Sequence, residues 1–403
     1  MGNDRQSADL KRVIGFWGIT FYGLGGIIGA GIFATIGAIT ARAGVYAPLA
    51  FVIAGIPALF AALSYGQLVK RLPKAGGEAA YVFAAFKSKT LMRIVALGVA
   101  LSGSVSAATL LSAFAGYFQA VAISPAWMVK GVLGLVSVAL AVGGVSMSTG
   151  VVIFITLIEV GLLLLIFGAG AGEAISYPGW MLAATPPEGL VFSLGASAVL
   201  AFFAFIGFED VVNMAEEVKD APKVLPRALI LAFVVSLVLY LGVCAVAVMS
   251  VPIEELGASD EPLADVARSQ GILPPAVMTA MALASIGNGV IIQINMVSRL
   301  LYGLAKDGGA PQLFSKVWSQ TGTPAFSVLL CGAAVYGFAV LLPLEQLAEL
   351  TGVIVLAVFA FVQLALIQLI RKEGAGAGSR MRSYLIPIAG FLSSIVLMFG
   401  ALV

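Results

Sequence analysis

A succession of long apolar runs, separated by short polar segments, constrains this chain of 403 residues more than any other feature. Hydrophobic residues make up 61% of it and charged residues 10%, whereas soluble domains have roughly 45–50% and 25%. A membrane-spanning helix needs about 20 mainly apolar residues. Backbone N–H and C=O groups inside a bilayer must hydrogen-bond to one another, as they do in helices and closed β-barrels. Barrel strands alternate between apolar and polar residues, and these long apolar runs do not. The runs therefore predict an all-α integral membrane protein and exclude a soluble enzyme.

Eleven runs, bounded by charges or by Pro/Gly loops, predict eleven transmembrane helices. The expected ranges are 14–40, 45–69, 92–122, 126–145, 149–172, 190–217, 228–250, 273–304, 325–343, 347–370 and 384–403. With a cytoplasmic N-terminus at 1–13, inner segments hold 19 of the 22 Lys and Arg and outer segments hold 3. This asymmetry is what the positive-inside rule requires, so we expect a multi-pass protein of the cell membrane.

The composition also removes several kinds of chemistry. The chain has no histidine, its two cysteines lie in apolar runs, and its net charge is +2. Histidine-ligated metal sites, histidine-based catalytic triads and nucleic-acid binding are therefore not expected. We predict no cofactor, no metal and no enzymatic activity. The expected partners are the lipid bilayer and a small-molecule substrate.

Two of the runs are interrupted near their middle. The first, 14–40, holds a cluster of five glycines, and the sixth, 190–217, has Gly207 followed closely by Glu209 and Asp210. The glycines of the first are Gly23, Gly25, Gly26, Gly29 and Gly31. Glycine-interrupted helices at matching places in two halves of opposite orientation point to a transporter site. We therefore predict an inverted repeat of five helices over 14–172 and five over 190–371, with 384–403 as an additional helix. Close helix packing is the alternative explanation for the glycines.

Several motifs resemble those of the amino acid–polyamine–organocation superfamily of permeases. They are GIIGAGIF at 26–33, ALSYGQL at 62–68, PKAGGE at 73–78, FAFIGFE at 203–209, EEVKD at 216–220, LPRA at 225–228, SRLLY at 298–302 and KDG at 306–308. The resemblance implies the LeuT-type fold, in which helices one and six of a 5+5 inverted repeat are broken at mid-membrane. Members often have twelve helices, so a homodimer built on a twelfth helix would lack that helix here. Gln67 occupies a position that is often Glu in the family.

The resemblance implies a binding site for an amino acid zwitterion at the two breaks. Backbone N–H groups of Gly29, Ala30 and Gly31 would receive the carboxylate at the positive end of a half-helix. Carbonyl groups would receive the amine, and they belong to Ile27, Phe205, Ile206 and Gly207. Phe203 and Phe205 would lie against the substrate side chain or act as gates, with core packing as the alternative.

Acidic and polar residues within the apolar runs suggest how transport is coupled. Glu159 has thirteen uncharged residues on each side, and a charge at mid-bilayer costs about 2.5–3.5 kcal/mol. It lies at or near the position where related permeases carry a lysine in place of sodium. We expect either a protonatable coupling residue or a permanently protonated structural one. Glu209 is favoured over Asp210 for a gating role, with a helix-end charge as the alternative.

The eighth run adds a group of polar residues, of which Ser285, Asn288 and Gln293 are candidates for coupling or for lining the cavity. Asn288 falls where sodium-dependent relatives would carry a hydroxyl, which favours protons or exchange over sodium. The leading hypothesis is a secondary transporter that moves amino acids by alternating access. A polyamine or organic-amine transporter, and a membrane sensor that binds without transport, are the alternatives.

Overall fold

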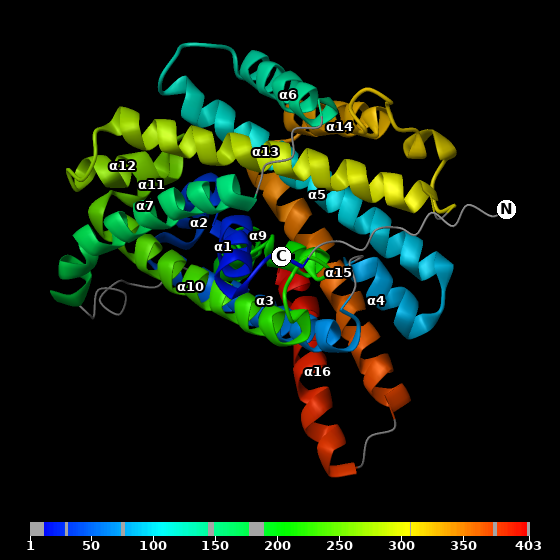
Figure 1. Cartoon of the computed structure of the whole chain (residues 1–403). Helices are drawn as coiled ribbons and strands as arrows, with labels where there is room; N and C mark the ends of the chain where they lie inside the picture. The colour runs from blue at the N-terminus through cyan, green and yellow to red at the C-terminus, as the bar shows by residue number, and fades with distance from the viewer. Residues whose placement is uncertain are drawn as a thin grey trace.

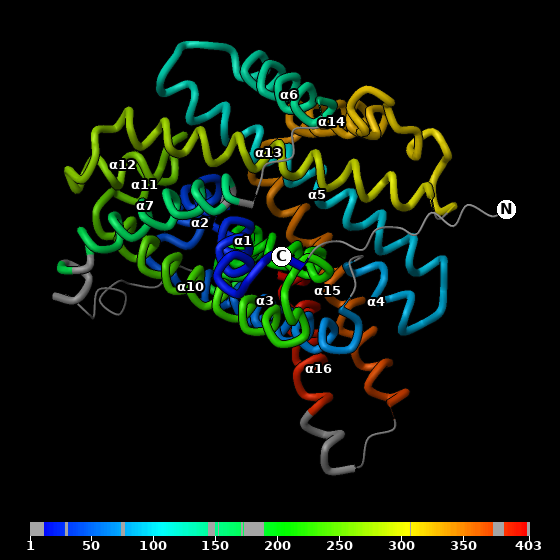
Figure 2. Tube along the Cα trace, in the orientation of Figure 1, coloured from blue at the N-terminus to red at the C-terminus, as the bar shows by residue number. Residues whose placement is uncertain are grey.

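A computed structural model describes residues 12–28, 31–73, 77–143, 149–176, 189–306, 308–373 and 377–400. Within these ranges the chain is mostly helical and forms no strand. Figures 1 and 2 show a bundle of long helices with the short helices α11 (Ile253–Ala258) and α12 (Pro262–Ser269) at one end. The helix α4 (Gly77–Phe86) lies toward the opposite end. The predicted helical membrane architecture is confirmed.

The first and sixth apolar runs are each divided. The first consists of two helices, α1 (Phe16–Ile28) and α2 (Gly31–Ala43). The sixth consists of α9 (Leu190–Phe203), a turn at 204–207 and the 3₁₀ segment η2 (Phe208–Met214). Gly207, at the end of this turn, has a φ of 122°, which L side chains rarely adopt. The turn at 204–207 falls where the sequence predicts an interruption, whereas residues 29 and 30, between α1 and α2, lie outside the described ranges.

Long helices surround the divided ones. They are α3 (Ala47–Arg71), α5 (Lys89–Gln119), α7 (Thr149–Ser176), α10 (Ala221–Ser250), α13 (Pro275–Lys306), α15 (Leu344–Glu373) and α16 (Ala377–Gly400). Two shorter apolar helices, α6 (Ala126–Val142) and α14 (Ala325–Leu341), pack against each other and against α5. Helix α10 packs against α1, α3 and α7, while α13 and α15 pack against α5. The divided helices therefore lie between two groups of continuous ones. Three short 3₁₀ or α segments complete the described chain: η1 (Gly44–Tyr46), η3 (Gln312–Ser315) and α4.

Eight stretches of the described residues are long and apolar enough to cross a membrane. One of them, Phe16–Arg71, contains α1, α2 and α3 together, and α6 and α14 are shorter apolar helices outside the eight. The total of eleven crossings, and the boundaries of the two repeats, therefore stay predictions.

Backbone hydrogen bonds join the start of α1 to the end of η2. The amide of Val13 donates to the Glu217 carbonyl at 2.9 Å, and the amide of Lys219 donates to the Ile14 carbonyl at 2.9 Å. Ile14 and Val218 form an isolated parallel bridge. The ends of α1 and η2 that lie away from the interruptions are thus held together, which fixes how the two interruptions face each other.

Candidate functional site

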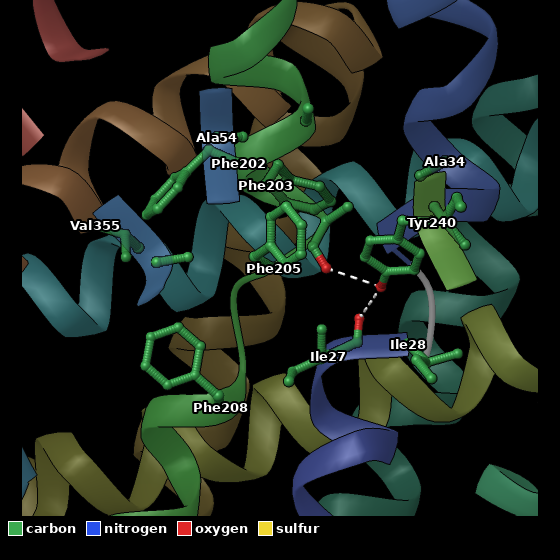
Figure 3. Close-up of a cluster of buried hydrophobic side chains, with 14 of the residues drawn as sticks. Ile27, Ile28, Ala34, Ala54, Phe202, Phe203, Phe205, Phe208, Tyr240 and Val355 are labelled. Atoms are coloured by element: carbon green, nitrogen blue, oxygen red, sulfur yellow. Dashed lines mark hydrogen bonds between the residues drawn. The ribbon is translucent and has the colours of Figure 1, made fainter. Parts of the chain in front are cut away.

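The two interruptions meet at the hydroxyl group of Tyr240 on α10. This hydroxyl lies 2.7 Å from the carbonyl oxygen of Ile27 and 2.9 Å from that of Ala204 (Figure 3). Carbonyls in the last turn of a helix have no partner within the helix, and Tyr240 is fully buried. The single hydroxyl proton is shared between the two acceptors. A third helix thereby links both interruptions, and it occupies the Ile27 carbonyl that the sequence predicts as an amine acceptor.

Tyr240 is a site residue that the sequence analysis missed. The available signal was a tyrosine within the apolar run 228–250, because a buried tyrosine hydroxyl usually has a hydrogen-bond partner. The identity of that partner depended on the tertiary packing of three segments.

Glycines allow the divided helices to approach each other closely. A Cβ atom on Gly31 would lie 2.7 Å from the Cα of Ala204, and one on Gly207 would lie 2.3 Å from the Gly26 carbonyl oxygen. Close packing, the alternative left open by the sequence, therefore accounts for Gly31.

The other two predicted carboxylate donors, Gly29 and Ala30, lie outside the described residues. Their role in binding a carboxylate stays a prediction.

The turn of the sixth run presents backbone acceptors. The carbonyl of Gly207 accepts a hydrogen bond from the Asp210 amide at 3.2 Å. The carbonyls of Phe205 and Ile206 accept none from the part of the chain that the structure describes. These two carbonyls therefore have no hydrogen-bond partner in the described part of the chain.

The side chains of Phe203 and Phe205 belong to the helical core. Both are buried, and the Phe205 ring contacts Tyr240, Phe233 and Phe51 at centroid distances of 5.3, 5.6 and 6.3 Å. Figure 3 shows Phe205 beside Tyr240. Among the described residues, neither phenylalanine lines the cavity described next. The structure thus places them in the packing role, and Ile206 reaches the cavity instead.

A small cavity of about 20 Å³, partly open to solvent, lies beside this turn. It is enclosed by residues of α4, α5, α13 and α15 together with the turn and η2. Its lining consists of Glu78, Val99, Ser102, Gly103, Ser106, Ile206, Glu209, Asp210, Gln293, Met296, Thr351, Val355, Val358 and Phe359. Three of the predicted site residues, Ile206, Glu209 and Gln293, meet here.

Three carboxyl groups lie in the cavity wall. Glu209 accepts a hydrogen bond from the Gly207 amide at 2.9 Å, and Glu78 accepts one from the Tyr65 hydroxyl at 2.8 Å. Asp210 is the third. Glu78 lies on α4, outside the candidate spans, and burial raises the pKa of its carboxyl group. The sequence analysis favoured Glu209 over Asp210, assigned no role to Glu78, and had no local signal that would bring α4 to this cavity.

A separate polar contact joins α7 to α13. The Ser285 hydroxyl donates to the carboxyl group of Glu159, which is only 4% exposed. Helix α7 also packs against α1. The structure therefore brings together two of the predicted coupling residues. Asn288 is not part of this contact, and its Oδ1 atom is buried without a partner among the residues described.

Two interrupted helices that face each other beside a polar cavity, within an apolar helical bundle, define a membrane transporter. The fold is similar to that of MhsT in complex with L-phenylalanine, with a TM-score of 0.62 at 11% identity over 97% of this chain and 99% of that one. This similarity concerns the fold alone, and it confirms the LeuT-type architecture.

The chain belongs to the amino acid permease family, whose model matches residues 14–403. It is 28% identical to the branched-chain amino acid permease BcaP of Bacillus subtilis, over 90% of this chain and 82% of the relative. It is 30% identical to the chloroplastic cationic amino acid transporter 9 of Arabidopsis thaliana, over 76% of this chain and 58% of the relative. It is 27% identical to the methylthioribose transporter of Bacillus subtilis, over 96% of this chain and 87% of the relative. The protein is therefore a multi-pass membrane transporter of small molecules.

Proposed function

We propose that this protein is a secondary active transporter that moves amino acids across the cell membrane by alternating access, with its N-terminus in the cytoplasm. The observation that carries the proposal is the meeting of the two interruptions. The unpaired carbonyls of Phe205 and Ile206 lie on one side, and α1 and α2 lie on the other. A zwitterion needs N–H donors for its carboxylate and oxygen acceptors for its ammonium group; the turn at 204–207 carries the acceptors, and the N–H groups predicted at 29–31 would supply the donors.

The same geometry supports movement around a fixed site. The ends of α1 and η2 that lie away from the interruptions are joined by backbone hydrogen bonds between residues 13–14 and 217–219. The interruptions provide a point at which α1 and η2 change direction relative to α2 and α9. Rocking of the joined segments would open the site to one face of the membrane while α2 and α9 close the other.

Proton coupling or exchange is the mode of energisation that we propose. Glu159 is buried in α7, and its carboxyl group is held by a neutral donor, the Ser285 hydroxyl. A carboxyl group in that setting can exist with or without a proton, and its charge would change the contact between α7, α1 and α13.

The names of the relatives cover branched-chain amino acids, cationic amino acids and methylthioribose, so family membership does not choose the cargo. The test is uptake by purified protein in proteoliposomes, with the common amino acids and polyamines competing against a labelled amino acid. Each competition is run with and without a pH gradient. We expect accumulation of at least one amino acid that increases with an inward proton gradient.

Other outcomes would point to the alternatives. Binding without accumulation would indicate a sensor. Accumulation of putrescine or spermidine, with every amino acid excluded, would indicate an amine transporter and contradict the proposal. Accumulation that is unaffected by the pH gradient but stimulated by amino acid on the opposite side would indicate exchange.

A further inference from the structure

We propose that residues 308–324, which connect α13 to α14, form an anchor at the membrane surface that binds the headgroup region of anionic phospholipids. This connection contains η3 and a tight hairpin in which Trp318 pairs with Thr323. Figure 1 shows it, yellow to orange, at the edge of the bundle. The inference does not depend on which molecule the protein transports.

The first observation is the exposure of large apolar side chains outside the long helices. Leu313 is 42% exposed, Val317 is 45% exposed and Trp318 is 49% exposed. The eight candidate membrane spans exclude all three residues. Exposed apolar side chains that gather in one place indicate contact with another molecule or with a membrane. The connection therefore has an apolar surface that the described chain leaves uncovered.

Hydrogen bonds hold this connection firmly against two helices. The Ser327 hydroxyl on α14 donates to the Phe314 carbonyl of η3 at 3.0 Å, and the rings of Phe314 and Phe326 pack at a centroid distance of 5.4 Å. The Thr323 hydroxyl donates to the Val142 carbonyl, at the end of α6, at 2.8 Å. The backbone is therefore fixed on both sides of the exposed residues, and their exposure belongs to an ordered surface.

The same contacts place the connection at the level where apolar helices end. It begins where α13 ends, stops where α14 begins and is bonded to the last residue of α6. Its apolar surface continues onto α14, where Phe326, Leu329 and Leu330 are also exposed. Exposed apolar residues of a membrane-spanning helix face lipid, and tryptophan is favoured at the membrane–water interface. This continuity favours the bilayer over a soluble protein as the covering partner.

The charge of the connection selects the kind of lipid. Residues 308–324 include one lysine, Lys316, and no acidic residue. Lys316 is exposed and forms no ion pair with the described residues. At the start of the connection, the Arg93 guanidinium donates to the Gly308 carbonyl at 2.9 Å. Basic side chains beside an interfacial apolar segment attract anionic headgroups, and the apolar stem of lysine lets its ammonium group reach them.

The test of depth uses Trp318 as its own probe. Trp17→Phe, Trp127→Phe and Trp180→Phe leave Trp318 as the only one of four tryptophans, and the full-length protein is reconstituted into bilayers. Its fluorescence is quenched by phospholipids brominated just below the headgroup, by phospholipids brominated near the end of the acyl chain, or by iodide in the water. We expect the shallow bromines to quench most strongly and iodide to quench least.

The test of headgroup preference uses bilayers with equal parts of phosphatidylglycerol and phosphatidylcholine, with shallow bromines on one lipid or the other. We expect brominated phosphatidylglycerol to be the better quencher by about fivefold, the factor that one lysine near an anionic surface contributes. Lys316→Gln should remove most of this preference. The control Lys223→Gln, which removes one exposed lysine from the start of α10, should keep it.

Three results would overturn the inference. Strong quenching by iodide with none by brominated lipid would show that the connection faces water or a soluble partner. Stronger quenching by the deep bromines would contradict a position at the interface, and equal quenching by the two lipids would contradict a preference for anionic headgroups. If the three tryptophan substitutions prevent folding, the signal of Trp318 is obtained as the difference between the wild-type protein and Trp318→Phe. All of these results leave the proposed transport function unaffected.

Discussion

The hydroxyl group of Tyr240 offers a direct test of how the two interruptions are held. Tyr240→Phe removes one oxygen atom and leaves the ring in its contacts with Phe51 and Phe205. The carbonyls of Ile27 and Ala204 then lose their shared donor in a fully buried place. A buried acceptor left unpaired costs about 1–3 kcal/mol. Because one proton serves both carbonyls, we expect one such cost and not two.

The measurement is the thermal unfolding temperature of the purified protein, followed by a saturation curve for the transported amino acid. Tyr336→Phe on α14 is the matched control, since its hydroxyl forms no hydrogen bond with the described residues. We expect Tyr240→Phe to unfold at a lower temperature than Tyr336→Phe. It should also bind substrate more weakly, by at most about tenfold for each 1.4 kcal/mol that the bound state loses.

The reasoning would be refuted if Tyr240→Phe and Tyr336→Phe had the same unfolding temperature and the same affinity for substrate. That result would mean that water or a small shift of α10 replaces the hydroxyl, and that the two interruptions hold their positions without it.

Three further changes test other parts of the structure. Gly207→Ala places a Cβ on a backbone with φ 122°, 2.3 Å from a carbonyl oxygen, so strain and overpacking should destabilise the protein by about 2–6 kcal/mol. The control Gly161→Ala, in α7 with open space around it, should be neutral or stabilise the protein by up to about 1 kcal/mol. Equal unfolding temperatures for the two variants would contradict this prediction. Glu159→Gln should abolish uptake driven by a pH gradient while counterflow exchange continues, and an unchanged pH dependence would exclude Glu159 as the proton carrier. Burial raises the pKa of Glu78, so ionisation of its carboxyl group destabilises the folded protein as pH rises above about 4.5. Glu78→Gln, which can still accept a hydrogen bond from Tyr65, should therefore raise the unfolding temperature more at pH 8 than at pH 5. A larger gain at pH 5 would contradict a raised pKa for Glu78.

The broad architecture followed from local properties of the sequence. Long apolar runs require helices because a bilayer offers no partners to the backbone, and the glycines at 23–31 and at 207 mark the two places where those helices are divided. The resemblance in the motifs at 26–33 and 203–209 pointed to the same two segments. Even so, the number of membrane crossings was not settled by the helices alone, since α6 and α14 are shorter than the eight candidate spans.

The site was predicted less completely, because its contacts join segments that are far apart in the chain. The sequence identified Ile206, Glu209 and Gln293, which line one cavity, and Glu159 with Ser285, which form a hydrogen bond. It placed Phe203 and Phe205 with the core as one of two alternatives, and the structure puts them there.

From the sequence alone came the class of protein, the helical runs and the places where two of them break, because hydrophobicity and glycine content act over a few neighbouring residues. Only the tertiary structure decided that Tyr240 would join the two breaks and that Glu78 on α4 would share a cavity with Asp210. Those contacts depend on the register and the direction in which helices pack. Many side chains on a helix have the same local character, and packing selects the few that meet.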